Sequence, residues 1–293
     1  MNLHEPNGPD YSQPILIAPD TWWVGFYDPE LGLHCNPYLI VDGEEAVLID
    51  GGSRPDFPSV MMKILQTGLE PNQIKALIYQ HYDPDLVGGV SSFESLINRS
   101  DLQIISHRAN HMFIRHYAIS SPLVGLEQMG HVFRFSSGRK LRFVETPYSH
   151  SAGSFVTYDP LTRALFTSDL LGSYGKKWDL FLRLDAACRG CGSREACPQG
   201  HGYCPLHDMV GFHRHIMTSG RALRLAISRL ARLPFRLAAP QHGSVIAQAE
   251  DIQAVLERLF TLEGVGIDGV DDDGEDGGLD RLREERRRSL AGG

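Results

Sequence analysis

The strongest chemical signal in the chain is the segment HYDPD at residues 81–85, which directly follows an apolar run with the composition of a buried strand. In an extended or turning segment alternate side chains share a face, so His81, Asp83 and Asp85 can converge on one point. Pro84 removes a backbone donor and favours a loop. Three such residues also occur together by chance on solvated loops, so the segment alone only indicates a metal site.

Three further residues follow other apolar runs. His150 lies in the small-residue loop PYSHSAG, Asp169 comes directly after a strand-like run, and His242 lies in PQHGS after another. Open sheets place their sites at the carboxyl ends of strands. The alternatives are a turn cap for Asp169 and a loop imidazole bonded to backbone for His242. Together with residues 81–85, these residues predict a single metal centre.

Four of the five cysteines crowd into an insert at about residues 183–208, whereas Cys35 stands alone. In a reducing compartment such a cluster favours metal or redox chemistry over structural disulfides. The insert could supply four thiolates to zinc or to an iron–sulfur cluster. The alternatives are a redox-active thiol pair and ordinary packing, and the spacing matches no standard finger or ferredoxin run. The residues of this candidate second metal site are Cys188, Cys191, Cys197 and Cys204.

Other histidines and aromatic residues are expected to have structural roles. Surface or capping positions are predicted for His107, His111, His116 and His131. Core positions, rather than the pocket lining, are predicted for Tyr82, Trp23 and Tyr38. His213 and His215 lie near the start of a predicted helix and are expected on its solvated face. The alternative is that they approach the metal centre.

Strands and helices alternate along the chain and must position these side chains. Strands are predicted at residues 37–41, 46–50, 74–80, 102–106, 132–135, 141–145, 154–158, 164–168 and 235–239. Helices are predicted at residues 57–67, 86–98, 108–117, 209–233 and 250–262. Two series of strands, each with covering helices, predict an α/β protein of the αββα sandwich type.

One domain is predicted over residues 1–263. The chain has 293 residues, of which 42% are hydrophobic, and this suffices for a sizeable core. Residues 264–293 are predicted to form an acidic tail. Its Gly- and Asp-rich first part, to Gly278, is expected to be disordered, with a short charged helix at about residues 279–290.

Composition argues against several classes of partner. The chain has 28 Lys and Arg against 36 Asp and Glu, a formal net charge of −8, which disfavours nucleic acid. No apolar stretch is long enough to span a bilayer, so no membrane is expected. The polar N-terminus lacks a secretory signal pattern. The expectation is a cytoplasmic protein.

The order and context of the candidate ligands resemble the metallo-β-lactamase superfamily. The matching motifs are His-x-Asp-x-Asp, His-Ser-x-Gly-Ser, an Asp after Phe-Thr-Ser, and Pro-Gln-His-Gly. The resemblance runs from about Trp22 to Leu262. Zinc hydrolases of the superfamily usually carry His-x-His-x-Asp-His, whereas this chain has Asp83 in place of the second His and Leu86 in place of the last.

A carboxylate at the second position is similar to the flavodiiron proteins and to the flavin-free oxygen-binding diiron proteins, whose motif reads His-x-Glu-x-Asp-His. The segments WVGF and CNPYLI, which begin at Trp23 and Cys35, are similar to the same branch. The resemblance implies one iron held by His81, Asp83 and His150, a second held by Asp85 and His242, and a bridging Asp169. Leu86 stands at the position of the remaining ligand, which implies an open second metal.

The resemblance implies two iron ions, with zinc or manganese as alternatives. Carboxylate with imidazole and vacant positions suits iron and its reactions with O2. The implied function is a non-haem diiron protein that binds O2 or NO, either as an O2 sensor or as an O2 or NO reductase. No catalytic residue is expected beyond the metal ligands.

No FMN domain is expected in this chain, so a reductase would need a separate electron donor. A redox or signalling protein partner and a homodimer stay open. Two other readings also remain: a binuclear hydrolase of a lactone or thioester that uses a metal-bound hydroxide, and a non-catalytic binding module.

Overall fold

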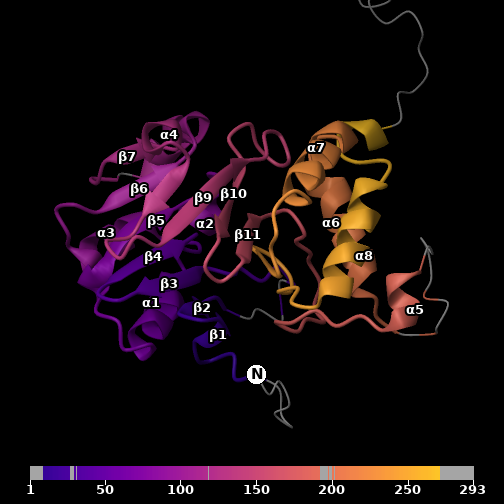
Figure 1. The fold of residues 1–293 in the computed structure, drawn as a ribbon, viewed down its shortest axis with the longest axis horizontal. Helices are drawn as coiled ribbons and strands as arrows, with labels where there is room; N and C mark the ends of the chain where they lie inside the picture. Colours follow the sequence, from indigo (N-terminus) through magenta and orange to yellow (C-terminus); the bar gives the residue numbers. More distant parts are fainter. Residues whose placement is uncertain are drawn as a thin grey trace, which may run out of the picture.

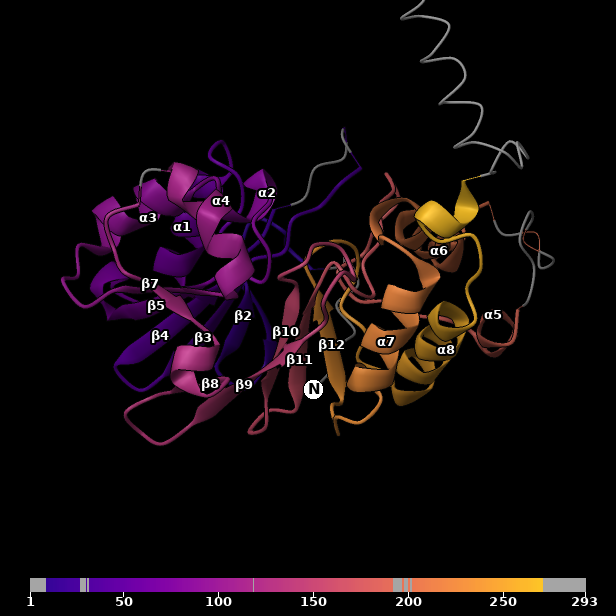
Figure 2. The same ribbon diagram turned by 90° about the horizontal axis from the view of Figure 1, so that it is seen from above.

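A computed structural model describes residues 9–26, 30, 32–117, 119–191, 197, 200 and 202–270. Two β-sheets pack face to face, and helices cover their outer faces (Figures 1 and 2). This arrangement confirms the predicted αββα sandwich. Within these ranges, no helix has both the length and the apolar character needed to cross a membrane.

The larger sheet has seven strands, and their spatial order follows the chain. They are β1 (Ile15–Ala18), β2 (Thr21–Trp23), β3 (Tyr38–Asp42), β4 (Glu45–Ile49), β5 (Ile74–Ile78), β6 (Gln103–Ser106) and β7 (Leu123–Gly125). Strands β1 to β4 pair antiparallel, and β4 to β7 pair parallel. Parallel strands covered on both faces read as continuous apolar runs, as β4 and β5 do. The chain leaves the carboxyl end of β5 and reaches His81.

The smaller sheet has the order β12-β11-β10-β9-β8. Its strands are β8 (Val132–Arg134), β9 (Lys140–Glu145), β10 (Phe155–Asp159), β11 (Ala164–Ser168) and β12 (Leu237–Pro240). All its pairs are antiparallel except β11 with β12, in which Ser168 is opposite Pro240. That parallel pair brings the loops carrying Asp169 and His242 to the same edge.

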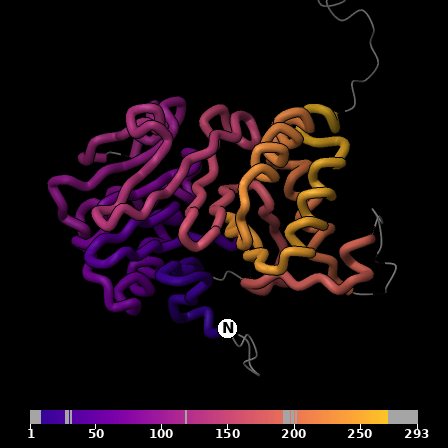
Figure 3. Tube along the Cα trace, in the orientation of Figure 1, coloured from indigo at the N-terminus to yellow at the C-terminus, as the bar shows by residue number. Residues whose placement is uncertain are grey.

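Helices form the outer layers, and the two halves of the chain supply one layer each (Figure 3). The helices are α1 (Phe57–Gln66), α2 (Pro84–Val87), α3 (Val90–Ile97), α4 (His111–Ile114), α5 (Ala186–Arg189), α6 (Pro205–Ile216), α7 (Gly220–Leu230) and α8 (Ala249–Phe260). Short 3-10 helices lie at Pro71–Gln73, Arg108–Asn110, Arg115–Tyr117, Glu127–Met129 and Ile267–Gly269.

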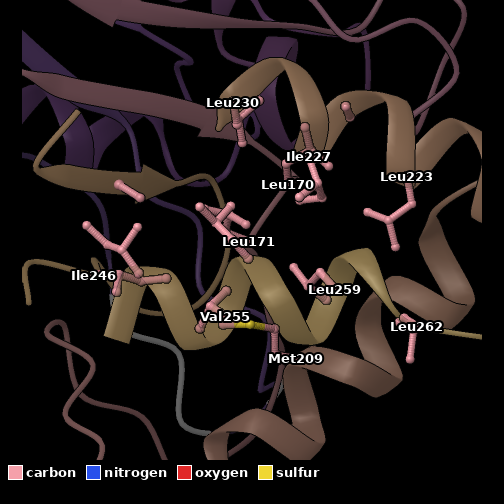
Figure 4. Close-up of a cluster of buried hydrophobic side chains, with 14 of the residues drawn as sticks. Leu170, Leu171, Met209, Leu223, Ile227, Leu230, Ile246, Val255, Leu259 and Leu262 are labelled. Atoms are coloured by element: carbon pink, nitrogen blue, oxygen red, sulfur yellow. The ribbon is translucent and has the colours of Figure 1, made fainter. Parts of the chain in front are cut away.

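Three buried apolar clusters correspond to the three spaces between the layers. Ile78 and Phe166 belong to the cluster between the two sheets, whereas Phe93 belongs to the one beneath α1 and α3. The third cluster fills the space beneath α6, α7 and α8 (Figure 4). Along β11, Phe166 faces the inner cluster and its neighbour Leu165 the outer one, as the alternation of a strand requires.

Several elements differ from the prediction. The helix predicted at 209–233 is two helices, because Ser219 is extended and its side chain caps α7 by accepting from the Ala222 N–H. The helix predicted at 86–98 is divided at Gly88–Gly89 into α2 and α3. Strands β1, β2 and β7 were not predicted from the sequence.

The folded body continues past the predicted boundary at residue 263. Val265 is fully buried, and the Gly220 N–H donates to the Asp268 carboxylate at 2.8 Å. The N–H of Ile267 also donates to the Thr218 carbonyl at 3.1 Å. These contacts hold residues 264–270 against the start of α7. The rest of the predicted tail, with its short helix, lies outside the described residues.

Candidate metal centre

The structure brings all six predicted ligands to one place at the common edge of the two sheets. His81, Asp83 and Asp85 follow β5, and His150 lies in the loop between β9 and β10. Asp169 and His242 follow β11 and β12. Five of the six line an open cavity of about 490 Å³, namely Asp83, Asp85, His150, Asp169 and His242. His81 is almost fully buried beside them.

Asp169 lies at the middle of this arrangement. Its Oδ1 is 3.8 Å from Nε2 of His81 and 3.8 Å from Nε2 of His242. This atom is buried and has no hydrogen-bond partner among the described residues. A buried carboxylate oxygen without a donor is costly unless a cation neutralises it. The position suits a carboxylate that bridges two metal ions.

Two sets of ligand atoms lie on either side of Asp169. In the first set, Nε2 of His150 is 2.8 Å from Oδ2 of Asp83, and Nε2 of His81 is 3.7 Å from the same oxygen. In the second set, Nε2 of His242 is 3.0 Å from Oδ2 of Asp85. Each set thus combines imidazole with carboxylate, as the sequence predicts.

The Nδ1 atom of each histidine is bonded to the protein, which leaves Nε2 for the centre. Nδ1 of His242 donates to the His34 carbonyl at 3.0 Å, and Nδ1 of His150 donates to the Ile216 carbonyl at 3.3 Å. Nδ1 of His81 is 2.8 Å from the Ser168 hydroxyl. Such outer bonds fix the orientation of metal-ligating imidazoles. The donor set and its outer bonds therefore fit two metal ions.

Close charges shift the pKa values of these groups. Burial opposes the charged form of His150, but the Asp83 hydrogen bond and the Asp169 charge raise its pKa to about 9. Burial likewise opposes ionisation of Asp85, but the His242 hydrogen bond lowers its pKa to about 2. Both residues are therefore charged at neutral pH, as parts of partly buried ion pairs. A metal ion would take the place of the imidazole protons in those pairs.

Sequence reasoning missed Asp50, which directly follows β4 and supports the loop of His81. The Gln80 N–H donates to Oδ1 of Asp50 at 3.1 Å, and the Gln80 side-chain amide donates to Oδ2 at 3.3 Å. Burial raises the pKa of Asp50 to about 8, helped by the Asp169 and Asp85 charges. The position of Asp50 after a strand, as for Asp169, could have indicated it.

Sequence reasoning also missed Cys35 as a site residue. Its Sγ is 4.0 Å from Oδ2 of Asp85, and the ligand atoms of Cys35, Asp85 and His242 all lie within 4.8 Å of one another. Burial raises the pKa of the thiol, and hydrogen bonding to His242 opposes the rise. A solitary cysteine has no spacing from which such a position could be predicted.

Leu86 and His213 do not supply the missing ligand. Leu86 is fully buried in the cluster beneath α1 and α3. His213 is also fully buried, so its predicted solvated position is wrong, whereas His215 is exposed as predicted. Nε2 of His213 accepts from the Leu171 N–H at 3.1 Å, and Nδ1 donates to the Met209 carbonyl at 2.8 Å. Both nitrogens are used, and burial lowers its pKa to about 4.

Trp23 and Tyr38 lie in the core, as predicted, whereas Tyr82 is only partly buried and packs against the cluster beneath α1 and α3. Trp23 and Tyr38 are buried, and both hold the site's backbone: Trp23 Nε1 donates to the Asn36 side chain at 2.8 Å, and the Tyr38 hydroxyl donates to the Pro240 carbonyl at 2.8 Å. Tyr82 stacks on Phe113 with ring centroids 4.1 Å apart.

The four histidines predicted at surface or capping positions lie at caps or near the surface. His107 accepts from the Ala109 N–H, and Nε2 of His131 is 2.8 Å from the Glu145 carboxylate. His111 is half-buried and bonded to the Ser106 carbonyl, and His116 is exposed. None of them lines the cavity described above.

The cysteine insert does not form a compact ligand set among the described residues. All four of its cysteines are free, and none belongs to a group of three ligand atoms within 4.8 Å. Cys188 and Cys204 pack instead against the cluster beneath α6 to α8. The second metal site predicted at Cys188, Cys191, Cys197 and Cys204 gains no support from this geometry and stays a prediction.

A family model described as ODP family beta lactamase matches residues 33–243. The chain belongs to this family. Membership confirms the metallo-β-lactamase resemblance and, within it, the branch of the oxygen-binding diiron proteins. The match begins just before Cys35 and ends just after His242, so it includes all six predicted ligands.

Solved and curated relatives agree with the family. A solved structure, "Peroxy diiron species of chemotaxis sensor ODP", has a TM-score of 0.69 and 22% identity and covers 87% of this chain and 97% of that one. Diflavin flavoprotein A 1 of Synechocystis sp. is 29% identical over 52% of this chain and 27% of its own length. The anaerobic nitric oxide reductase flavorubredoxin of Enterobacter sp. is 25% identical over 55% of this chain and 35% of its own length. The matched regions thus span only about a third of these curated relatives.

Proposed function

We propose that this ODP-family protein is a non-haem diiron protein that binds O2 or NO. The observation that carries the proposal is the unpartnered, buried Oδ1 of Asp169, which lies 3.8 Å from the Nε2 atoms of both His81 and His242. One carboxylate between two imidazoles suits a pair of metal ions that share a bridging ligand. The mixture of carboxylate and imidazole favours iron over zinc, which prefers histidine and cysteine.

The six residues hold the two ions in the roles that their positions suggest. His81, Asp83 and His150 would hold the first iron, Asp85 and His242 the second, and Asp169 would bridge them. When bound, a reduced iron pair supplies electrons and vacant positions for a diatomic ligand. The protein keeps the imidazoles oriented through the backbone carbonyls of His34 and Ile216 and the hydroxyl of Ser168.

The cavity over the centre suits a small ligand. Leu33, Phe212 and Ile216 line it, together with the carboxylates and imidazoles of the site. Because the cavity is open to solvent, O2 or NO can reach the centre through it. Tyr174 and Lys176 also line it and are exposed to solvent.

Two features of the relatives support the choice of ligand. The solved neighbour is named as a chemotaxis sensor and a peroxy diiron species, and a curated relative is named as a nitric oxide reductase. Sensing would require a signalling partner, whereas reduction would require an electron donor that these residues do not themselves provide. Repeated O2 or NO consumption with excess artificial reductant would indicate a reductase, and a single binding event would indicate a sensor. No observation on the site favours the hydrolase.

The bridging role of Asp169 provides the test. Wild-type protein, Asp169→Asn and the control Glu257→Gln, an exposed acid of α8, are reconstituted anaerobically with Fe(II) and passed over a desalting column. We expect about two irons per chain in wild type and in Glu257→Gln, and at most one in Asp169→Asn. Wild-type protein that retains no iron would contradict the proposal.

A further inference from the structure

We infer that Cys35 is a thiolate ligand of the second metal ion and supplies the donor that Leu86 does not. The inference rests on the proposed two-metal centre. It adds a sulfur ligand to the carboxylate and imidazole set, and it predicts a second ion that is firmly bound.

The ligand atoms are spaced for a single ion. Sγ of Cys35 is 4.0 Å from Oδ2 of Asp85, and the same oxygen is 3.0 Å from Nε2 of His242. The three ligand atoms all lie within 4.8 Å of one another. Bonds of about 2.0 to 2.3 Å to nitrogen, oxygen and sulfur place neighbouring ligand atoms roughly 3 to 4 Å apart. These atoms can therefore share one ion without a change of backbone.

An independent observation points to the same position. Oδ1 of Asp169 is buried without a hydrogen-bond partner among the described residues and lies 3.8 Å from Nε2 of His242. It would be the fourth donor to the ion that Cys35, Asp85 and His242 surround. An unpartnered carboxylate oxygen beside an imidazole is unfavourable unless a cation lies between them.

The chain holds Cys35 and His242 in a fixed relation. The backbone N–H of Asn36, next to Cys35, donates to the Gln241 carbonyl at 2.8 Å. The side-chain amide of Asn36 donates to the Pro240 carbonyl at 3.0 Å and to the Gly243 carbonyl at 2.8 Å. These acceptors lie on both sides of His242 in the chain. These hydrogen bonds tie the backbone next to Cys35 to the backbone on either side of His242.

The surroundings of Cys35 are those of a ligand. A buried cysteine often acts as a small apolar residue, but Cys35, only 4% exposed, belongs to none of the three hydrophobic clusters. Leu86, at the position of the usual histidine ligand, packs in the hydrophobic core. Its carbonyl accepts from the Gly51 N–H. The thiol instead faces Asp85 and His242.

Cobalt(II) provides the test, because a thiolate ligand gives a sulfur-to-cobalt charge-transfer band in the near ultraviolet. Cys188, Cys191, Cys197 and Cys204 are first replaced by Ser, which leaves Cys35 as the only thiol in the chain. Apo-protein of this background and its Cys35→Ser and Cys35→Ala derivatives are titrated anaerobically with Co(II), and circular dichroism checks the fold of each. We expect the band in the background protein and its loss in both derivatives, with at least about a tenfold weaker second binding step.

The outcomes separate this inference from the proposed function. Binding of two cobalt ions without the band, or a band that persists in Cys35→Ser, overturns the role of Cys35 and leaves the two-metal centre standing. Failure of the wild-type chain to bind either cobalt or iron overturns the centre itself. If the background variant does not fold, the difference spectrum between cobalt-loaded wild type and single Cys35→Ser decides in the same way.

Discussion

At the scale of single residues, sequence reasoning can find the ligands but not the groups that orient them. His81, Asp169 and His242 each come just after a buried strand, and this position is visible in the sequence. The carbonyls that accept from Nδ1 of His150 and His242 lie 66 and 208 residues away, so only the fold brings them near. For the same reason the sequence could not predict that Cys35 lies beside Asp85.

Ser168 offers a test of the outer bonds. Its hydroxyl lies 2.8 Å from Nδ1 of His81, and its backbone adopts a φ of 54° at the turn before Asp169. Ser168→Ala removes the bond, and we expect about a 10- to 100-fold loss of affinity for the first metal ion with the fold retained. Competition with a chromophoric chelator measures the affinity. The control is Ser228→Ala, which removes an α7 hydroxyl that donates to the Arg224 carbonyl. This variant should bind the metal ion as tightly as wild type does. Equal affinities in the two variants would rule out an orienting role for Ser168.

At the scale of elements, the prediction succeeded where burial imposes a simple pattern. Strands β4, β5 and β11 are covered on both faces, so most of their residues are apolar. These apolar runs therefore predict where the strands lie. The prediction failed where a turn interrupts a helix, at Gly88–Gly89 and again before Ser219, because apolar spacing continues across both breaks.

The capping bond of Ser219 explains the break between α6 and α7. Its side chain accepts from the Ala222 N–H at 3.2 Å. Ser219→Ala should lower the free energy of unfolding by about 1 kcal/mol, whereas Ser219→Asp, which keeps an acceptor, should lie within about 0.5 kcal/mol of wild type. Urea denaturation of the three proteins measures the difference. An alanine variant as stable as wild type would show that the break does not depend on the cap.

Glu45 links the two sheets and gives the protein a defined pH dependence. Its carboxylate on β4 is bonded to Lys75 of β5 and to Ser136 of the turn between β8 and β9. Burial raises its pKa, but the Lys75 and Ser136 bonds outweigh burial and lower the pKa to about 2 from 4.5. A lowered folded-state pKa gives stability that is present above about pH 4.5 and is lost as the pH falls towards 2.

Glu45→Gln should therefore be less stable than wild type at pH 7, by about 1 to 2 kcal/mol. The difference should shrink as the pH falls and should be smallest near pH 3. Denaturation between pH 3 and pH 7 measures it, with the exposed neighbour Glu44→Gln as control. A difference that does not change with pH would mean that the charge of Glu45 contributes nothing.

At the scale of the whole molecule, the metal centre joins the two halves of the sandwich. His81, Asp83 and Asp85 come from the larger sheet, whereas His150, Asp169 and His242 come from the smaller one. The sequence predicted this architecture because two series of strands, each with its helices, are visible along the chain. It could not predict that residues 264–270 are ordered, since tertiary contacts with α6, Thr218 and the start of α7 hold them in place.

Metal binding should accordingly stabilise the entire domain. An ion that binds only the folded state adds about 2.7 kcal/mol to the free energy of unfolding when its concentration is a hundred times its dissociation constant. We expect a higher melting temperature for iron-loaded wild type than for the apo-protein, and a much smaller rise for Asp169→Asn. Anaerobic calorimetry measures both. Equal melting temperatures with and without iron would mean that the ions do not bridge the two halves.

The most direct test of the central claim is the ultraviolet–visible spectrum of iron-reconstituted protein, with its iron content measured on the same sample. The protein is reduced without oxygen, and O2 or NO is then added. The proposed centre predicts about two irons per chain and a spectrum that changes on addition of the gas. Substituting Asp169→Asn should abolish that change. Protein that binds two zinc ions in place of iron would contradict the proposed diiron centre. So would protein with two irons whose spectrum does not change with either gas.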